Sequence, residues 1–162
     1  MELGTWNFEP ETMLKYYNYD IVFQEIPDEV TLAVNLTNCP HRCVGCHSPH
    51  LREDIGDVLN DKTLDTLLKK YGQQITCVCF MGGDGQPQEV EKLVKHLRQH
   101  SKLKVAWYSG NTNMPRNASL FDYVKVGGYQ EKLGGLRSRT TNQRLYRNTN
   151  GQPEDITSRF WR

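Results

Sequence analysis

The sequence predicts an α/β fold with a mostly parallel sheet, in a single domain that covers residues 1–162. Apolar runs of strand length alternate along the chain with amphipathic segments of helix length. A chain of this kind crosses one face of the sheet before each new strand pairs, which makes the pairing parallel. The 162 residues suit a partial barrel or an open sheet, because a closed barrel of eight such units takes about 250 residues.

The expected strands are runs of β-branched, aromatic and other apolar residues. The first covers Tyr17–Ile26 and turns at Pro27-Asp28. The others follow in chain order as Val30–Leu36, Ile75–Met81, Leu103–Tyr108 and Asp122–Val126. The last four end at a cysteine loop or at glycines, which are typical of strand-to-loop boundaries.

Two helices are expected between these strands, because apolar residues there recur at the i, i+3, i+4, i+7 spacing of one helix face. We expect Asp61 to cap the first helix and Gly72 to end it. Pro87 stands near the start of the second, where its missing N–H costs nothing. The apolar faces consist of Leu64, Leu67, Leu68 and Tyr71 in the first helix and Val90, Leu93, Val94 and Leu97 in the second.

Composition narrows the classes of partner. The formal net charge is +1, so no overall positive field attracts nucleic acid, and we expect no nucleic-acid partner. No apolar run approaches the roughly 18 residues that span a bilayer. The N-terminal residues show no basic stretch followed by an apolar one, as a secretory signal would. The sequence therefore predicts a cytoplasmic protein without membrane contact.

Three of the five cysteines, Cys39, Cys43 and Cys46, fall within eight residues in the spacing C-x3-C-x2-C. An odd cysteine count and such a cluster favour a metal or redox site over a disulfide framework. Thiolates suit zinc, copper(I) or iron–sulfur clusters. An electron-transfer [4Fe–4S] cluster uses four cysteines, so three leave one iron open for substrate. The alternative is a structural zinc site with His47 or His50 as fourth ligand.

The other two cysteines, Cys77 and Cys79, alternate within an apolar run and are interpreted as small buried residues. The strand ends carry the unusual loops: the three cysteines, then Gly82-Gly83-Asp84, then Ser109-Gly110, then Gly127-Gly128. Ligands collect at the carboxyl ends of parallel strands. The sequence therefore predicts one site where these four loops meet.

The cysteine spacing after a strand resembles the signature of the radical S-adenosylmethionine (SAM) superfamily, and Gly82-Gly83-Asp84 resembles its Gly-Gly-Glu motif. Within the superfamily the chain is similar to the glycyl-radical activases of anaerobic ribonucleoside-triphosphate reductases. The similarity covers most of the chain, through the stretches NLTNCPHRCVGCHSPHL, CFMGGDGQP, AWYSG, FDYVKVGGY and GGLRSRTTNQRLYR.

This resemblance implies a partial, TIM-like radical SAM barrel and a [4Fe–4S] cluster held by Cys39, Cys43 and Cys46. It implies that SAM binds the open iron and that an electron from flavodoxin or ferredoxin cleaves SAM to a 5′-deoxyadenosyl radical. That radical would take a hydrogen from a backbone glycine of the large reductase subunit. The cofactor supplies the difficult chemistry and the protein supplies positioning.

The resemblance also implies the residues that contact SAM. Gly82 and Gly83 would let the backbone approach the methionine moiety, and Asp84, shorter than the usual Glu, would accept from its ammonium group. Tyr108 and Ser109 match the region that borders ribose and methionine. Gly45 stands where many relatives have an aromatic residue, so His47 is the candidate that lies beside adenine. The alternatives are a helix cap for Asp84 and strand-end packing for Tyr108.

The segment 134–162 is expected to be a C-terminal docking extension, since it carries Arg137, Arg139, Arg144 and Arg147 with Tyr146 among them. A solvated terminal strand is the alternative for this segment. For the whole chain, two alternatives stay open. One is another small radical SAM enzyme, either a different glycyl-radical activase or a 7-carboxy-7-deazaguanine synthase. The other is a zinc-stabilised binding module.

Overall fold

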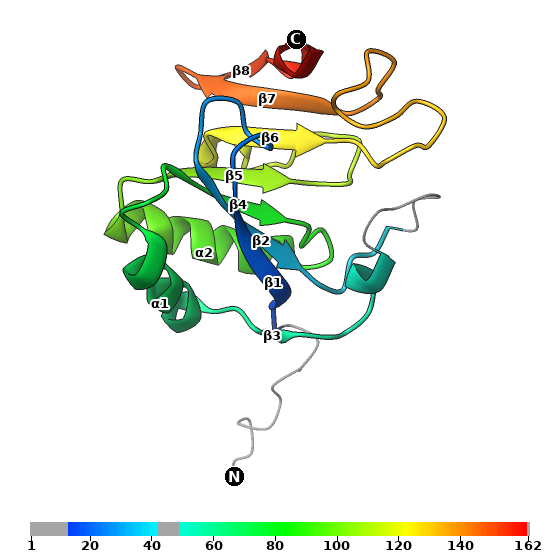
Figure 1. The fold of residues 1–162 in the computed structure, drawn as a ribbon. Helices are drawn as coiled ribbons and strands as arrows, with labels where there is room; N and C mark the ends of the chain where they lie inside the picture. The colour runs from blue at the N-terminus through cyan, green and yellow to red at the C-terminus, as the bar shows by residue number, and fades with distance from the viewer. Residues whose placement is uncertain (1–12, 42–48, 162) are drawn as a thin grey trace.

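The computed structural model describes residues 13–41 and 49–161 (Figure 1). Within these ranges, eight strands form one open sheet in the order β3-β1-β2-β4-β5-β6-β7-β8. The strands are β1 (Lys15–Val22), β2 (Thr31–Leu36), β3 (Asp57–Val58), β4 (Cys77–Met81), β5 (Lys104–Tyr108), β6 (Tyr123–Val126), β7 (Arg144–Thr149) and β8 (Gln152–Asp155). Four of the five expected strands lie within a residue or two of these bounds, and β1 begins and ends earlier than the expected first strand.

The sheet is mixed, whereas the alternation of elements led us to expect a mostly parallel one. β2, β4, β5 and β6 pair in parallel at the centre. The outer pairs are all antiparallel, because β1 turns back into β2 at Pro27-Asp28 and the chain returns after β6 to form β7 and β8. Asp28 takes the left-handed φ of 68° that this turn requires. With β3 and β8 as its edges, the sheet is not closed. A partial, TIM-like radical SAM barrel stays a prediction.

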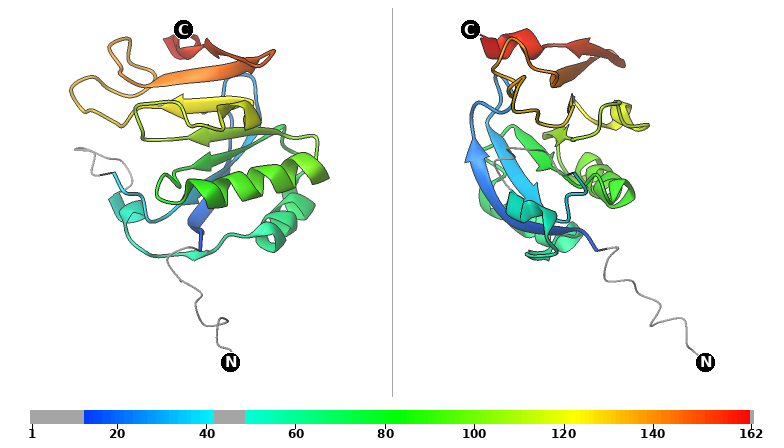
Figure 2. Two further views of the ribbon diagram at one scale, coloured as in Figure 1. Left: turned by 180° about the vertical axis from the view of Figure 1, so that it is seen from behind. Right: turned by 90° about the vertical axis from the view of Figure 1, so that its right-hand side faces the viewer.

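Both expected helices are present and cover one face of the sheet (Figure 2). They are α1 (Asp61–Tyr71) and α2 (Pro87–His100), and Pro87 opens α2 as expected. The cap of α1 is Asn60 and not Asp61, because Asn60 has the extended backbone of a cap and its side chain accepts from the Thr63 N–H at 3.0 Å. Gly72 ends α1, and its N–H donates to the Leu68 carbonyl at 2.7 Å.

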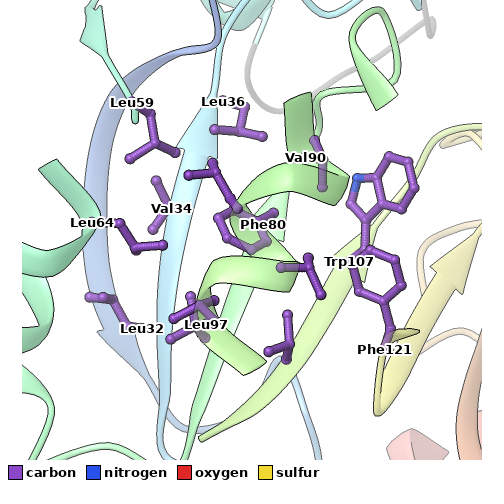
Figure 3. Close-up of a cluster of buried hydrophobic side chains, with 14 of the residues drawn as sticks. Leu32, Val34, Leu36, Leu59, Leu64, Phe80, Val90, Leu97, Trp107 and Phe121 are labelled. Atoms are coloured by element: carbon purple, nitrogen blue, oxygen red, sulfur yellow. The ribbon is translucent and has the colours of Figure 1, made fainter. Parts of the chain in front are cut away.

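The main hydrophobic core fills the space between the sheet and these helices (Figure 3). Because side chains alternate along a strand, Val34, Phe80 and Trp107 face this core from three neighbouring strands. Burying a side chain of this size contributes roughly 1.5–3 kcal/mol. The core therefore fixes the register of the parallel strands, and with it the alignment of their carboxyl ends.

A second, smaller core covers the opposite face of the sheet. Cys77 and Cys79 are fully buried there, which confirms the interpretation of both as small core residues. Burial raises the pKa of Cys77 to about 12 and that of Cys79 well above its ordinary value, so both remain thiols near neutral pH. Ile26, from the connection between β1 and β2, and Ile156, after β8, close this core.

The C-terminal segment continues the sheet. β7 pairs with β6, and β8 pairs with β7 and is followed by a 3₁₀-helix, Thr157–Trp161 (Figure 1). Trp161 contacts the guanidinium groups of Arg139 and Arg144 at 5.7 and 6.0 Å from its ring. Docking of a partner by 134–162 stays a prediction. Among the described residues, no helix combines the length and the apolar character that a bilayer crossing needs.

Candidate active site at the carboxyl edge of the parallel strands

One row of side chains runs across the four parallel strands at their carboxyl ends. Asn35 pairs with Met81, Met81 with Tyr108, and Tyr108 with Lys125. All four line a cavity of about 440 Å³ on the face away from the helices. This volume falls in the range of roughly 300–1,000 Å³ that is typical of small-molecule sites.

The cysteine loop begins at this cavity. Asn38 turns the chain out of β2 with a φ of 60°, and Cys39 lies partly exposed in the cavity wall. Backbone bonds tie the two ends of the loop together: Asn38 N–H donates to Glu53 O at 3.2 Å and Cys39 N–H to Leu51 O at 2.9 Å. Cys43, Cys46 and His47 lie outside the described residues, so their expected roles stay predictions.

The two glycines after β4 point in different directions. Both have left-handed backbones, with φ of 101° at Gly82 and 89° at Gly83. Gly82 lines the cavity, and a Cβ there would meet its nearest neighbour, Leu36 O, only at 3.5 Å. A Cβ on Gly83 would instead lie 2.7 Å from Val90 Cγ2 and 2.8 Å from Leu36 Cδ1, inside the main core. The structure thus brings Gly82, but not Gly83, to the cavity.

Substitution of Gly83 with alanine is expected to destabilise the fold by about 1–3 kcal/mol, through overpacking added to backbone strain. Chemical denaturation measures the change. Gly151 is the matched control, because its φ is 83° and a Cβ there would meet nothing within 4 Å. Gly151→Ala therefore reports the backbone strain alone. Equal losses in the two variants would contradict the predicted clash with Val90 and Leu36.

Asp84 reaches the cavity wall, but its carboxylate lies among protein donors and its side chain is only 2% exposed. Oδ1 accepts from Ser109 Oγ at 2.6 Å and lies 3.5 Å from Asn111 Nδ2. Oδ2 accepts from Gly110 N at 2.7 Å and lies 2.9 Å from His41 Nε2. Asp84 thus joins the loops that follow β2, β4 and β5.

Tyr108 and Ser109, at the end of β5, differ in whether they face the cavity. The Tyr108 ring lines the cavity, and its hydroxyl donates to the carbonyl of Glu25. Burial raises the pKa of this phenol well above its ordinary value, so it stays protonated. Ser109 is 1% exposed, and its hydroxyl is directed to Asp84 and not to the cavity.

Lys125 lines the cavity, although it belongs to none of the expected site motifs. It is 8% exposed, and Nζ donates to the carbonyls of Ser109 and Gly127 at 2.9 and 3.0 Å. Nζ also lies 5.4 Å from the centre of the Tyr108 ring. The sequence did carry a signal for Lys125. A lysine inside an apolar strand is a buried charge, which is costly unless the lysine is paired, so such a residue often has a specific role.

A family model described as a 4Fe-4S single cluster domain matches residues 29–126. This match spans more than half of the chain and covers all four parallel strands and the cysteine loop. The chain belongs to this 4Fe-4S single cluster domain family. No curated protein and no solved structure matches the chain.

Membership in the 4Fe-4S family agrees with the chemistry of the site. A cluster of this family needs thiolate ligands, and Cys39 offers one in the cavity wall. The other two cysteines of the motif, Cys43 and Cys46, follow Cys39 in the sequence. The family favours iron–sulfur over the zinc alternative. The zinc site would need His47 or His50 as its fourth ligand. The ring of His50 lies 4.7 Å from that of Tyr17, measured between ring centres.

Proposed function

We propose that this protein is a radical SAM activase that generates a glycyl radical on anaerobic ribonucleoside-triphosphate reductase. Cys39, Cys43 and Cys46 would hold a [4Fe–4S] cluster, which would supply an open iron for SAM and a one-electron reduction, with flavodoxin or ferredoxin as the electron donor. Cleavage of the sulfonium bond then yields methionine and a 5′-deoxyadenosyl radical. This radical takes one hydrogen atom from a backbone glycine of the large reductase subunit, which gives 5′-deoxyadenosine and the glycyl radical.

The observation that carries the proposal is the position of Cys39 in the wall of a cavity that the carboxyl ends of the parallel strands form. Gly82 and Tyr108, two of the expected SAM contacts, border the same cavity. A cysteine of a 4Fe-4S family beside a ligand-sized cavity supports a cluster that acts on a bound small molecule.

The chain's own residues would bind SAM and cover part of it. The ammonium of Lys125 gives the cavity wall a positive charge, which favours a carboxylate such as that of the methionine moiety. Met81 and the Tyr108 ring offer apolar surface beside it. These groups would exclude water from the side of SAM that they cover.

The C-terminal segment supports a protein substrate. Gly135 and Gln143, which belong to the expected docking region, border the cavity together with Gly128 and Tyr129. A partner seated on this segment would therefore stand next to bound SAM. The open sheet also leaves a way in for a chain segment of another protein, whereas a closed pocket would exclude it.

The test is SAM cleavage by the anaerobically reconstituted protein. With dithionite and SAM, the protein should release 5′-deoxyadenosine and methionine in equal amounts, slowly in the absence of a reductase. Chromatography measures both products. A colourless, zinc-loaded protein without cleavage would support the binding-module alternative. Cleavage that activates no glycyl-radical protein would support another small radical SAM enzyme.

A further inference from the structure

The carboxylate of Asp84 is shared by elements that lie far apart in the sequence. His41 belongs to the first residues of the cysteine loop, while Ser109 and Gly110 follow β5. A carboxylate offers about four acceptor positions. Three short contacts, of 2.6, 2.7 and 2.9 Å, and a longer one to Asn111 use these positions.

The His41 ring packs closely against the backbone of Gly110. A Cβ on Gly110 would lie 2.6 Å from His41 Cδ2 and 2.9 Å from Nε2, so the imidazole lies against the bare Cα of Gly110. With 27% of its side chain exposed, His41 is held by Asp84 on one side and by Gly110 on another. The ring stands two residues after Cys39 and therefore restrains the start of the cysteine loop.

We propose that Asp84 is a positioning residue, which fastens the cysteine loop to the loops after β4 and β5 through His41, and that it is not a ligand of the SAM ammonium. The inference rests on the proposed function, whose cluster and substrate this arrangement would align. An ammonium group that bound this carboxylate, which is 2% exposed, would have to displace either Asn111 from its 3.5 Å contact or one of the three closer donors, Ser109, Gly110 and His41. Loss of those donors would leave buried polar groups without partners, which is costly.

A double-mutant cycle on His41 and Asp84 tests the inference. The variants are His41→Leu, Asp84→Asn and their combination, with His41→Gln as the conservative variant whose amide N–H donates in place of the imidazole. The matched control is the pair His96 and Asp65 on the two helices, whose Nε2 and Oδ1 atoms are 2.7 Å apart and remote from the cavity. One readout is the rate at which a chelator removes iron from the reconstituted protein, and the other is the KM for SAM beside kcat.

Positioning predicts that His41→Leu and Asp84→Asn each speed iron release by about tenfold, and that the double variant is no faster than either. His41→Gln should restore slow release, and the corresponding changes at His96 and Asp65 should have no effect. The electron paramagnetic resonance spectrum of the reduced cluster should lose its response to SAM equally in both single variants. Unfolding of the apo proteins by denaturant should show the same coupling between positions 41 and 84.

The inference is overturned if Asp84→Asn raises the KM for SAM while His41→Leu leaves it unchanged, since a direct ligand alone gives that pattern. Additive effects on iron release would also overturn it. Failure of the proposed function is a separate result: the parent protein would not cleave SAM, yet the coupling in apo-protein unfolding would still be measured.

Discussion

Cys39→Ala is expected to abolish both iron binding and SAM cleavage, and the same holds for Cys43→Ala and Cys46→Ala. Three thiolates are the fewest that hold a [4Fe–4S] cluster with one open iron, so each loss leaves the cluster short of a ligand. Cys39 stands in the cavity wall, and the family to which the chain belongs binds a single 4Fe-4S cluster. Iron content and visible absorption after anaerobic reconstitution measure the outcome, and 5′-deoxyadenosine release measures the activity.

Cys77→Ala and Cys79→Ala are the matched controls, because they remove the same atom from the same chain. Both thiols are fully buried in the smaller core, and their raised pKa values disfavour the thiolate that iron requires. These variants should keep a full cluster and lose only about 1 kcal/mol of stability, from the small cavity left behind. A requirement for Cys77 in cluster assembly would show that the ligand assignment is wrong.

The sequence was most informative where one physical pattern dominates. β2, β4, β5 and β6 are buried on both faces, so each appears as a nearly continuous apolar run that ends where polar loop residues begin. α1 and α2 face the core with one stripe each, which the helical spacing reveals directly. The loops after these strands could also be assigned to one edge of the sheet, because the carboxyl ends of parallel strands lie at the same edge.

The remaining features depend on tertiary contacts that a sequence does not display. All four residues of β8, Gln152–Asp155, are exposed, so no apolar pattern in the sequence predicts this strand. β8 forms because its backbone pairs with that of β7. Gly82 and Gly83 look equivalent in the sequence, but only the clash of a Cβ with Val90 and Leu36 distinguishes them. The contact of Asp84 with His41 joins residues 43 positions apart and follows from the fold alone.

Mixing the protein with anaerobic ribonucleoside-triphosphate reductase, SAM and a reductant is expected to produce a glycyl radical on the reductase. The signal is a doublet in electron paramagnetic resonance, because the unpaired electron couples to the remaining α-hydrogen. The partner should dock where Gly135 and Gln143 border the cavity, which would bring its glycine-bearing segment to the proposed site of radical formation. Without a reductase, the same reaction should release 5′-deoxyadenosine slowly and give no stable radical.

Two variants separate this outcome from adventitious radicals. A reductase in which the radical-bearing glycine is replaced by alanine should give no doublet, and neither should the intact reductase when it is mixed with the Cys39→Ala variant. Docking is tested by Gly135→Arg, which adds a long charged side chain to the border of the cavity at a position where a Cβ would meet only Gln143 Oε1, at 3.6 Å. This variant should reduce radical yield more than it reduces SAM cleavage without a reductase. Position 132 offers the control: Lys132 lies in the same stretch of chain but does not line the cavity, so Lys132→Ala should change neither.

A doublet that persists in the glycine variant, or that never forms with the intact reductase under strict anaerobiosis, would contradict the activase proposal, because the hydrogen must come from that glycine and the radical must arise from SAM.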